Sequence, residues 1–303
     1  MRVFPTTVTN TVTPKSAAQA VPPPAPPKSA PVAPAPAGLL STWKLFAHAL
    51  VSGQNVHVPG ALPPFPTLDP TQLARAQAAG RGRTVAQPLL SPDAASTSFH
   101  DPVNFVIRGS KDDLVKALEG QGWSLSASRS PWNFIKMGLS VLFHLGHDPG
   151  APVSAQYLNG QVETMAFNKN VDYNRGRDHL RVFSLGKDPK TGQDMWAVAA
   201  VRDDALSITF PHPDTHGKIW PWEWTWHKPM LSHASDSDID GERDLVMQDL
   251  LRSGLVQNWA AVDGKPPAVA QKTPLGDGRY KLLNRYPTDG QVYEVNLGGK
   301  PGA

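Results

Sequence analysis

The chain of 303 residues contains no cysteine, which excludes a disulfide framework, a thiolate metal site and a cysteine nucleophile. It also has no apolar run approaching the ~20 residues that span a bilayer. The N-terminal segment lacks the continuous apolar stretch of a cleaved signal peptide. We therefore expect a soluble protein that is cytoplasmic by default, with export by a route without a cleaved signal left open.

The sequence also lacks the short motifs of common enzyme classes. It contains no G-x-S-x-G, no Gly-rich phosphate loop and no H-E-x-x-H, so we assign no nucleophile and expect no cofactor.

The charge is unevenly distributed along the chain. Residues 1–100 carry seven Lys/Arg against two acids, whereas residues 101–303 carry 22 against 24. Because a nucleic-acid-binding domain should carry its positive charge on the fold itself, we expect no nucleic-acid partner.

Proline is abundant near the N-terminus. Residues 1–38 are rich in Pro, Ala and Thr, which predicts a disordered, extended tether. Residues 39–52 repeat apolar residues at helical spacing and predict a short amphipathic helix. That helix either packs on its own domain or makes a peripheral contact with a membrane or an unknown partner protein. Residues 53–98 return to loop-like composition and are predicted to be a linker.

The globular domain is predicted to cover residues 99–298. Ser110 caps a helix with Asp113 at the capping-box position, and further helices are predicted over 131–144, which should be buried, and over 240–253. Short strands are predicted at 103–107, 164–169, 179–185, 195–201 and 205–210, and a final hairpin from 279–286 and 291–297. Strands clustered between helical regions predict an α+β fold, with a largely antiparallel sheet packed with two or three helices.

An acidic run has the spacing that opens a calcium loop of the EF-hand kind, with Asp236, Asp238, Asp240 and Gly241 in sequence. The twelfth position of such a loop needs a bidentate carboxylate, and Met247 stands there. Because a thioether is a poor ligand for a hard cation, we favour a helix start capped by Asp238 or Asp240.

The start of this helix contains two charges on its apolar side. Glu242 and Arg243 lie four residues before Val246 and Met247, so they share a face with the apolar stripe. Charges at the core-facing end of a helix are unfavourable unless they are paired. This indicates either a structural ion pair or the wall of a site.

The segment 175–181 carries three arginines and a histidine. Such a group either clamps a phosphate or carboxylate, or belongs to a solvated edge strand whose arginines pair with Glu242, Asp238 or Asp203. We expect Glu242 and Arg181 to share one polar cluster. A metal site built on His179 and His233 has no supporting ligand spacing, so we predict none. The candidate anion-binding or polar-cluster residues are Arg175, Arg177, His179, Arg181, Asp238, Asp240, Glu242 and Arg243.

A second candidate surface is aromatic. Residues 219–226 alternate strictly, so four tryptophans share one face of an extended segment: Trp220, Trp222, Trp224 and Trp226. Stacked aromatic faces bind sugars, bases or lipid interfaces. The alternative is that these side chains fill the core between the sheet and a helix.

Residues ~101–297 resemble the LssY C-terminal domain family of bacterial proteins. The resemblance is carried, in order along the chain, by DPVN (101–104), GW (122–123), APVS (151–154), AF (166–167), HLRVF (179–183), DIDGERDL (238–245) and TDG (288–290). It implies a domain linked to a secretion system and often attached to multi-pass membrane segments, with no established activity. This chain differs by lacking a membrane segment and by inserting the Trp-rich segment before His233.

Two functional classes are consistent with these patterns. The first is a non-enzymatic binding or accessory module linked to the bacterial cell envelope, displayed on a Pro-rich tether. The second is a hydrolase that acts on a phosphorylated or lipid-like substrate through the Arg/His/acid residues. A strongly shifted pKa in a concave pocket would favour the enzyme, and a filled, ion-paired cluster would favour the module.

Overall fold

A computed structural model describes residues 39–52, 54–92, 101–127, 153–172, 175–209, 230–267, 272–282 and 286–298, with the single positions 132, 136, 139 and 143. The predicted tether at 1–38 and the tryptophans of 219–226 lie outside these residues. The helices within them are α1 (Leu39–Ser52), α2 (Pro70–Gly80), α3 (Lys111–Glu119) and α5 (Ile239–Arg252). The strands are β1 (Val56–Pro59), β2 (Thr84–Ala86), β3 (Phe105–Arg108), β4 (Ser124–Leu125), β5 (Tyr157–Leu158), β6 (Gln161–Val162), β7 (Met165–Asp172), β8 (Gly176–Lys187), β9 (Asp194–Thr209), β10 (Met230–Ser235), β11 (Val256–Lys265), β12 (Lys272–Pro274), β13 (Tyr280–Leu282), β14 (Tyr286–Thr288) and β15 (Gln291–Leu297).

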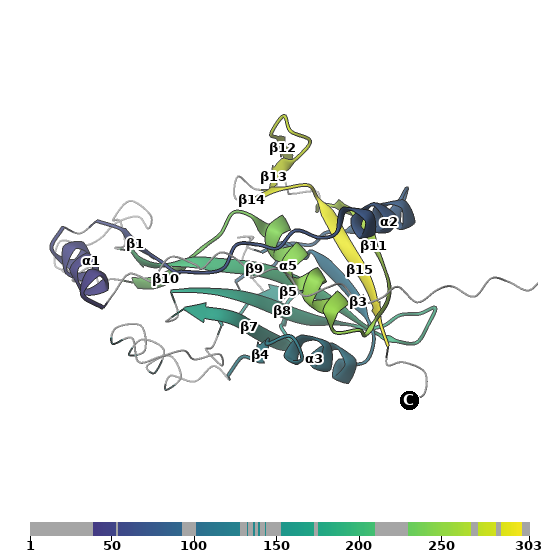
Figure 1. The fold of residues 1–303 in the computed structure, drawn as a ribbon, viewed down its shortest axis with the longest axis horizontal. Helices are drawn as coiled ribbons and strands as arrows, with labels where there is room; N and C mark the ends of the chain where they lie inside the picture. The colour runs from purple at the N-terminus through teal and green to yellow at the C-terminus, as the bar shows by residue number, and fades with distance from the viewer. Residues whose placement is uncertain are drawn as a thin grey trace, which may run out of the picture. The chain divides into compact units, whose positions relative to one another are not determined.

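Ten strands form one mixed sheet in the order β2-β11-β15-β3-β9-β8-β7-β4, with β1 and β10 both paired to β9. Its pairs are antiparallel except for β2 with β11 and β3 with β15. β9 is a single strand of 16 residues, where the sequence predicted two shorter ones. The helices α3 and α5 lie against this sheet (Figure 1), so the predicted α+β fold is confirmed.

Two of the predicted helices begin where the sequence places them. The hydroxyl of Ser110 accepts a hydrogen bond from the backbone N–H of Asp113 at 3.1 Å and starts α3. The carboxylate of Asp238 accepts one from the N–H of Gly241 at 3.0 Å and starts α5. Each cap satisfies an N–H group that has no partner inside the helix. Because α5 continues past Met247, the helix interpretation of the acidic run is confirmed.

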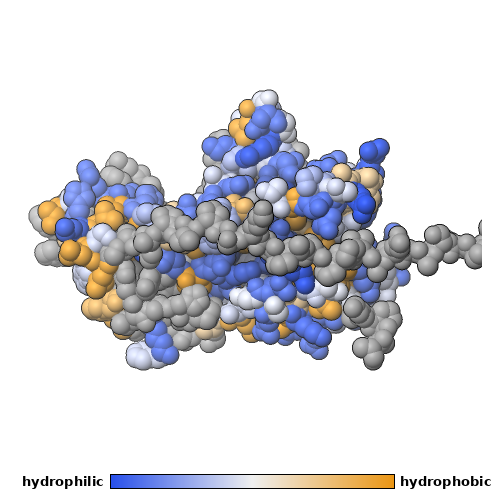
Figure 2. Space-filling model, viewed as in Figure 1, coloured by the Kyte–Doolittle hydropathy of each residue, from blue (hydrophilic) through white to orange (hydrophobic). Residues whose placement is uncertain are grey.

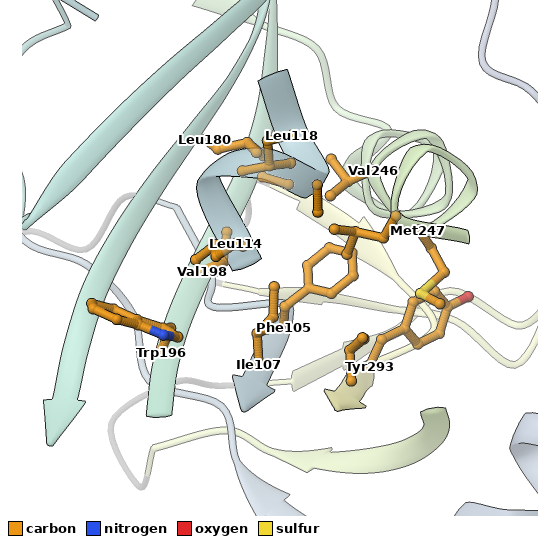
Figure 3. Close-up of a cluster of buried hydrophobic side chains, with 14 of the residues drawn as sticks. Phe105, Ile107, Leu114, Leu118, Leu180, Trp196, Val198, Val246, Met247 and Tyr293 are labelled. Atoms are coloured by element: carbon orange, nitrogen blue, oxygen red, sulfur yellow. The ribbon is translucent and has the colours of Figure 1, made fainter. Parts of the chain in front are cut away.

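The main core lies between α3, α5 and one face of the sheet (Figure 3). Helix residues at helical spacing and strand residues at alternate positions form this core together. Leu118 of α3, Met247 of α5, Leu180 of β8 and Val198 of β9 are examples. A second apolar cluster contains different residues of β8 and β9. Its members are Phe183, Ala197 and Ala199 with Leu90, Val103 and Leu158.

The interpretation of residues 53–98 as a linker is wrong for most of their length. This segment contains β1, α2 and β2, and Leu68 and Ala76 belong to the main core. The Asp69 side chain caps α2 by accepting from the N–H groups of Thr71 and Gln72 at 2.8 and 3.1 Å. The surrounding prolines gave this stretch a loop-like composition, although a proline at the first helical position fits a helix start.

The predicted final hairpin is also wrong. β13 pairs with β14 in a separate three-stranded sheet, whereas β15 lies between β11 and β3 in the main sheet. Most β15 residues are buried regardless of the face they point to, which suits a central strand better than an edge hairpin. The strand β11 was not predicted at all.

The apolar helix predicted at 131–144 differs from the structure in its burial. The described positions 132, 136, 139 and 143 are helical, yet Trp132, Leu139 and Phe143 are exposed. The helices that the structure describes include none long and apolar enough to cross a membrane.

Candidate functional site

Three of the candidate residues, Arg177, His179 and Arg181, lie on β8, and most of the others lie on α5 or cap it. β8 pairs antiparallel with β9 in a register that sets Arg177 opposite Asp203 and Asp178 opposite Arg202. Because side chains alternate between the faces of a strand, these two ion pairs lie on opposite faces of the sheet. The sequence therefore builds two separate polar clusters where one was predicted.

The first cluster, named here the His–Arg cluster, consists of Arg177, His179, Arg181, Asp203 and Asp101 and is almost fully buried. The Nε atom of Arg177 donates to the Oδ2 atom of Asp203 at 3.2 Å. The Nη1 atom of Arg181 donates to the Oδ2 atom of Asp101 at 2.8 Å. Of the acids expected as partners, Asp203 pairs with Arg177, whereas Arg181 pairs with Asp101, which was not expected. The expected solvated edge strand is wrong, because β8 lies between β7 and β9 and these side chains are buried.

The protonation state of His179 follows from its two contacts. The Nε2 atom lies 2.7 Å from Nη1 of Arg181, and a guanidinium can only donate, so Nε2 accepts. The ring proton is then on Nδ1, which faces Oδ2 of Asp203 at 3.3 Å. The neutral imidazole therefore has its Nε2 atom engaged by Arg181, while its Nδ1 atom faces the Asp203 carboxylate without reaching hydrogen-bond geometry.

Burial favours the neutral forms of both histidines in this region. It lowers the pKa of His179, and Arg181 adds to this effect while Asp203 opposes it. Burial also lowers the pKa of His233 to about 4, with its Nδ1 atom 4.0 Å from Oδ2 of Asp203. Burial alone would raise the pKa of Asp203, but His179, His233 and Arg177 around it hold that pKa below its usual range.

With neutral histidines, the cluster contains two arginines and two aspartates, so its charge is balanced. The same balance bears on metal binding, because two guanidinium groups beside His179 and Asp203 repel a divalent cation. The described part of the chain contains no group of three or more His, Asp or Glu residues arranged to hold a metal ion.

The second cluster, named here the carboxyl pair, lies under α5 and consists of Asp178 and Glu242 with Arg202 beside them. The carboxylate of Asp178 accepts from Nε of Arg202 and from Nδ2 of Asn170, both at 2.6 Å. Glu242 is 0% exposed, and neither of its carboxyl oxygens has a hydrogen-bond partner among the described residues. Its closest cation is Nε of Arg202, 3.9 Å from Oε2.

Glu242 is therefore held as a neutral acid. Burial raises its pKa well above the ordinary value, and the nearby carboxylate of Asp178 raises it further, whereas Arg202 opposes the shift. Since Arg202 is already used by Asp178, it cannot fully compensate a second negative charge. A protonated carboxyl group is the arrangement with the lowest desolvation penalty at this position.

A segment from the N-terminal part covers the carboxyl pair. The Phe65 ring stacks on the guanidinium of Arg202 at 3.8 Å, and the carbonyl oxygen of Pro63 accepts from Nη1 of Arg202 at 2.7 Å. Phe65 also packs directly on the first turn of α5, where a Cβ added to Gly241 would lie 2.4 Å from its ring. These contacts close the carboxyl pair to solvent.

Arg243 points to a third group of residues, at the turn between β14 and β15. Its two Nη atoms contact the two carboxylate oxygens of Asp289 at 2.8 and 3.0 Å, and its guanidinium lies over the Tyr293 ring at 4.4 Å. Asp240 accepts from the hydroxyl of Thr288 and from the N–H of Asp289, both at 2.8 Å. Asp240 and Arg243 thus fasten the start of α5 to this turn, which is a structural role.

The remaining candidates have local roles. Asp238 caps α5, and Arg175 lies at the β7–β8 connection with its Nη2 atom 3.3 Å from Oδ2 of Asp172. The prediction that Arg181 and Glu242 share one cluster is wrong. Glu242 lies on α5, which covers the face of β8 opposite to the one from which the Arg181 side chain projects. Parity along the strand placed Arg181 correctly with His179, but it could not show which face α5 covers.

Three residues of the clusters were missed as site candidates: Asp101, Asp178 and Arg202. The sequence held a signal for Asp178 and Arg202, since β8 and β9 carry charges at consecutive positions, which places charges on both faces of a buried strand.

A cleft of about 320 Å³ lies elsewhere in the described part of the chain, with α3, β4 and β7 residues in its wall, and no residue of either cluster lines it.

Comparison with known proteins gives one match. A family model described as LssY C-terminus matches residues 90–292. No curated protein matches the chain, and no solved structure does. The matched range includes both faces of β8 and β9 and all of α5, but it leaves out α2 and Phe65. The cover over the carboxyl pair therefore comes from a part of this chain that precedes the match.

Proposed function

The chain belongs to the LssY C-terminus family, and on that premise we propose that it is a non-enzymatic binding or accessory module of the bacterial cell envelope. The observation that carries this proposal is the closed, charge-balanced state of its buried clusters. Every arginine of the His–Arg cluster faces an aspartate, Nε2 of His179 contacts Arg181, and Nδ1 points toward Asp203 at 3.3 Å. A general base needs a ring nitrogen within reach of the proton that it removes.

The carboxyl pair supports the same conclusion. Glu242 has the shifted pKa that is typical of a catalytic acid. It is nevertheless fully buried and covered by Phe65, so no substrate atom can reach its proton in this arrangement. A strongly shifted pKa also arises where a structural carboxyl group is buried beside a second carboxylate.

One observation favours the alternative, a hydrolase for phosphorylated or lipid-like substrates. His179 turns its Nδ1 atom toward Asp203, as a general base does toward the carboxylate that orients it. If Arg181 released Nε2, that nitrogen would be free and Arg181 could bind an anionic group.

The experiment that separates the two is a hydrolysis panel with a phosphate monoester, a phosphate diester and a fatty-acyl ester as chromogenic substrates. We expect no turnover that distinguishes the natural chain from His179→Asn. Turnover that this substitution abolishes, in a variant that remains folded, would establish the hydrolase. Envelope association is tested by fractionating bacterial cells that express the full chain, and recovery only in the soluble fraction would contradict it.

A further inference from the structure

The helix α1 shows its apolar face to the outside. Leu40, Trp43 and Val51 lie on one side of it at helical spacing, and Leu40 and Val51 are 70% and 90% exposed. Leu45, on the opposite side, packs against Val58 and Leu206 and attaches the helix to the sheet. An amphipathic helix that only docks on its own domain would instead bury its wide apolar stripe. Figure 2 shows hydrophobic surface over this helix.

A second exposed apolar face lies beside it. Trp132, Lys136, Leu139 and Phe143 follow one another at intervals of three or four residues, so they share one side of their helix, and all four are exposed. The ring of Phe143 lies 6.0 Å from that of Trp43, so the two faces adjoin. We name the combined surface the apolar patch: Leu40, Trp43, Val51, Trp132, Leu139 and Phe143.

The two segments of the chain that form the apolar patch carry charge of only one sign. No acidic residue occurs before Asp69, and none occurs between Glu119 and Asp148, so both halves of the patch lie in stretches without carboxylates. Lys44 lies on α1, and the Nζ atom of Lys136 lies 5.8 Å from the centre of the Trp132 ring. Tryptophan and lysine interleaved with leucine are typical of a surface that rests at a lipid headgroup layer.

We propose that the apolar patch lies on the surface of an anionic lipid bilayer, with its apolar side chains at the boundary between headgroups and acyl chains and the neighbouring Lys44 and Lys136 at the headgroups. The inference rests on the envelope association proposed above and names the partner of this face. A bilayer suits the patch better than a protein partner, because the patch carries only positive charge and offers exposed tryptophans at two places. Anionic headgroups attract such lysines in addition to the burial of apolar area.

The test is co-sedimentation of the full chain with vesicles of phosphatidylethanolamine and phosphatidylglycerol, compared with vesicles of phosphatidylcholine. We expect binding to the anionic vesicles that weakens as salt is raised. Leu40→Ser combined with Trp132→Ser should weaken binding on the order of tenfold or more, because two large side chains no longer enter the bilayer. The control is Leu185→Ser with Leu275→Ser, since both leucines are exposed but lie outside the patch.

A second variant keeps the test independent of the apolar substitutions. Lys44→Gln with Lys136→Gln should lower the preference for anionic vesicles by roughly fivefold for each lysine. Equal binding by the natural chain and the apolar variant would overturn the proposal, as would equal binding to both vesicle types. A dimer in solution that the apolar variant dissociates would also overturn it, because the patch would then be an interface between copies. A chain that stays in the envelope fraction of cells yet binds no vesicle would refute the lipid assignment alone.

Discussion

The two faces of β8 and β9 differ in how many arginines they supply for each buried carboxyl group. On one face, the His–Arg cluster gives each of its two carboxylates an arginine within 3.2 Å. On the other, the carboxyl pair has one arginine for two acids, and Glu242 remains protonated. The difference shows that the number of available cations, more than the depth of burial, decides whether a buried acid carries charge here.

The largest loss of stability is expected from removing the carboxylate that Arg177 and His179 share. Asp203→Asn leaves the buried Arg177 without its aspartate partner and removes the carboxylate that faces Nδ1 of His179. We expect a loss of about 3–5 kcal/mol in the free energy of unfolding, measured by urea denaturation. Lys187→Ala serves as the control because its pair with Asp194 is solvent-exposed, and it should cost about 0–1 kcal/mol. Similar small losses for both variants would contradict the charge-balanced cluster.

The cover over the carboxyl pair gives the next largest effect. Phe65→Ala removes the ring that stacks on Arg202 and packs against Gly241, and we expect a loss of roughly 2 kcal/mol because this side chain is partly buried. Water should then reach Glu242 and bring its pKa closer to the ordinary value. Phe65→Leu, which keeps most of the apolar cover, is the matched control. An unchanged unfolding midpoint in urea for Phe65→Ala would show that residues 53–98 do not stabilise the fold.

The carboxyl pair predicts a fall in stability as pH rises. The folded protein keeps the Glu242 proton at pH values where the unfolded chain, with a pKa near 4.5, has released it. Stability therefore decreases as pH rises above about 4.5 toward the folded pKa, with a slope of at most about 1.4 kcal/mol per pH unit. Glu242→Gln should remove this slope in urea unfolding measured at increasing pH from pH 5 upward. Parallel pH profiles for the two proteins would show that Glu242 is ionised when folded.

The histidines on the opposite face predict the opposite sign, with a smaller effect. His233 has a folded pKa of about 4 against an ordinary 6.5, so the unfolded chain binds a proton that the folded protein does not. Stability from this group is complete above pH 6.5 and decreases as pH falls toward 4. His233→Asn should be less sensitive to acid than the natural chain over this interval, and a steeper acid dependence in the variant would contradict the assignment.

Local sequence patterns predicted several helices and strands, whereas contacts between distant parts of the chain determine which charged residues cluster together. The caps at Ser110 and Asp238 are contacts between residues three apart, so the sequence contains all the information that they need. Strand parity likewise placed His179, Arg181 and Phe183 on one face, although Arg177 was expected in a loop before the strand and lies within it. Which face α5 would cover depends on the position of the strands in the sheet, and no local pattern encodes this. Glu242 was therefore assigned to the wrong arginine.

The segment 53–98 illustrates a second limit. Its prolines and glycines lowered the signal of the helix α2, although Asp69 and Pro70 form a regular helix start. Gly80 is required where α2 ends, because a Cβ there would lie 1.8 Å from the carbonyl oxygen of Ala261. A close approach between residues this far apart in the chain cannot be read from composition. The cover that Phe65 provides to the carboxyl pair was missed for the same reason.

The most direct test of the two-face arrangement is a pair of double-mutant cycles on the free energy of unfolding. Arg181→Ala and Asp101→Ala should show a coupling energy of about 1–3 kcal/mol, because their side chains are in contact. Arg181→Ala and Glu242→Ala should be additive within about 0.5 kcal/mol, because the sheet separates them. Strong coupling in the second cycle and none in the first would place Arg181 and Glu242 in one cluster and contradict the account.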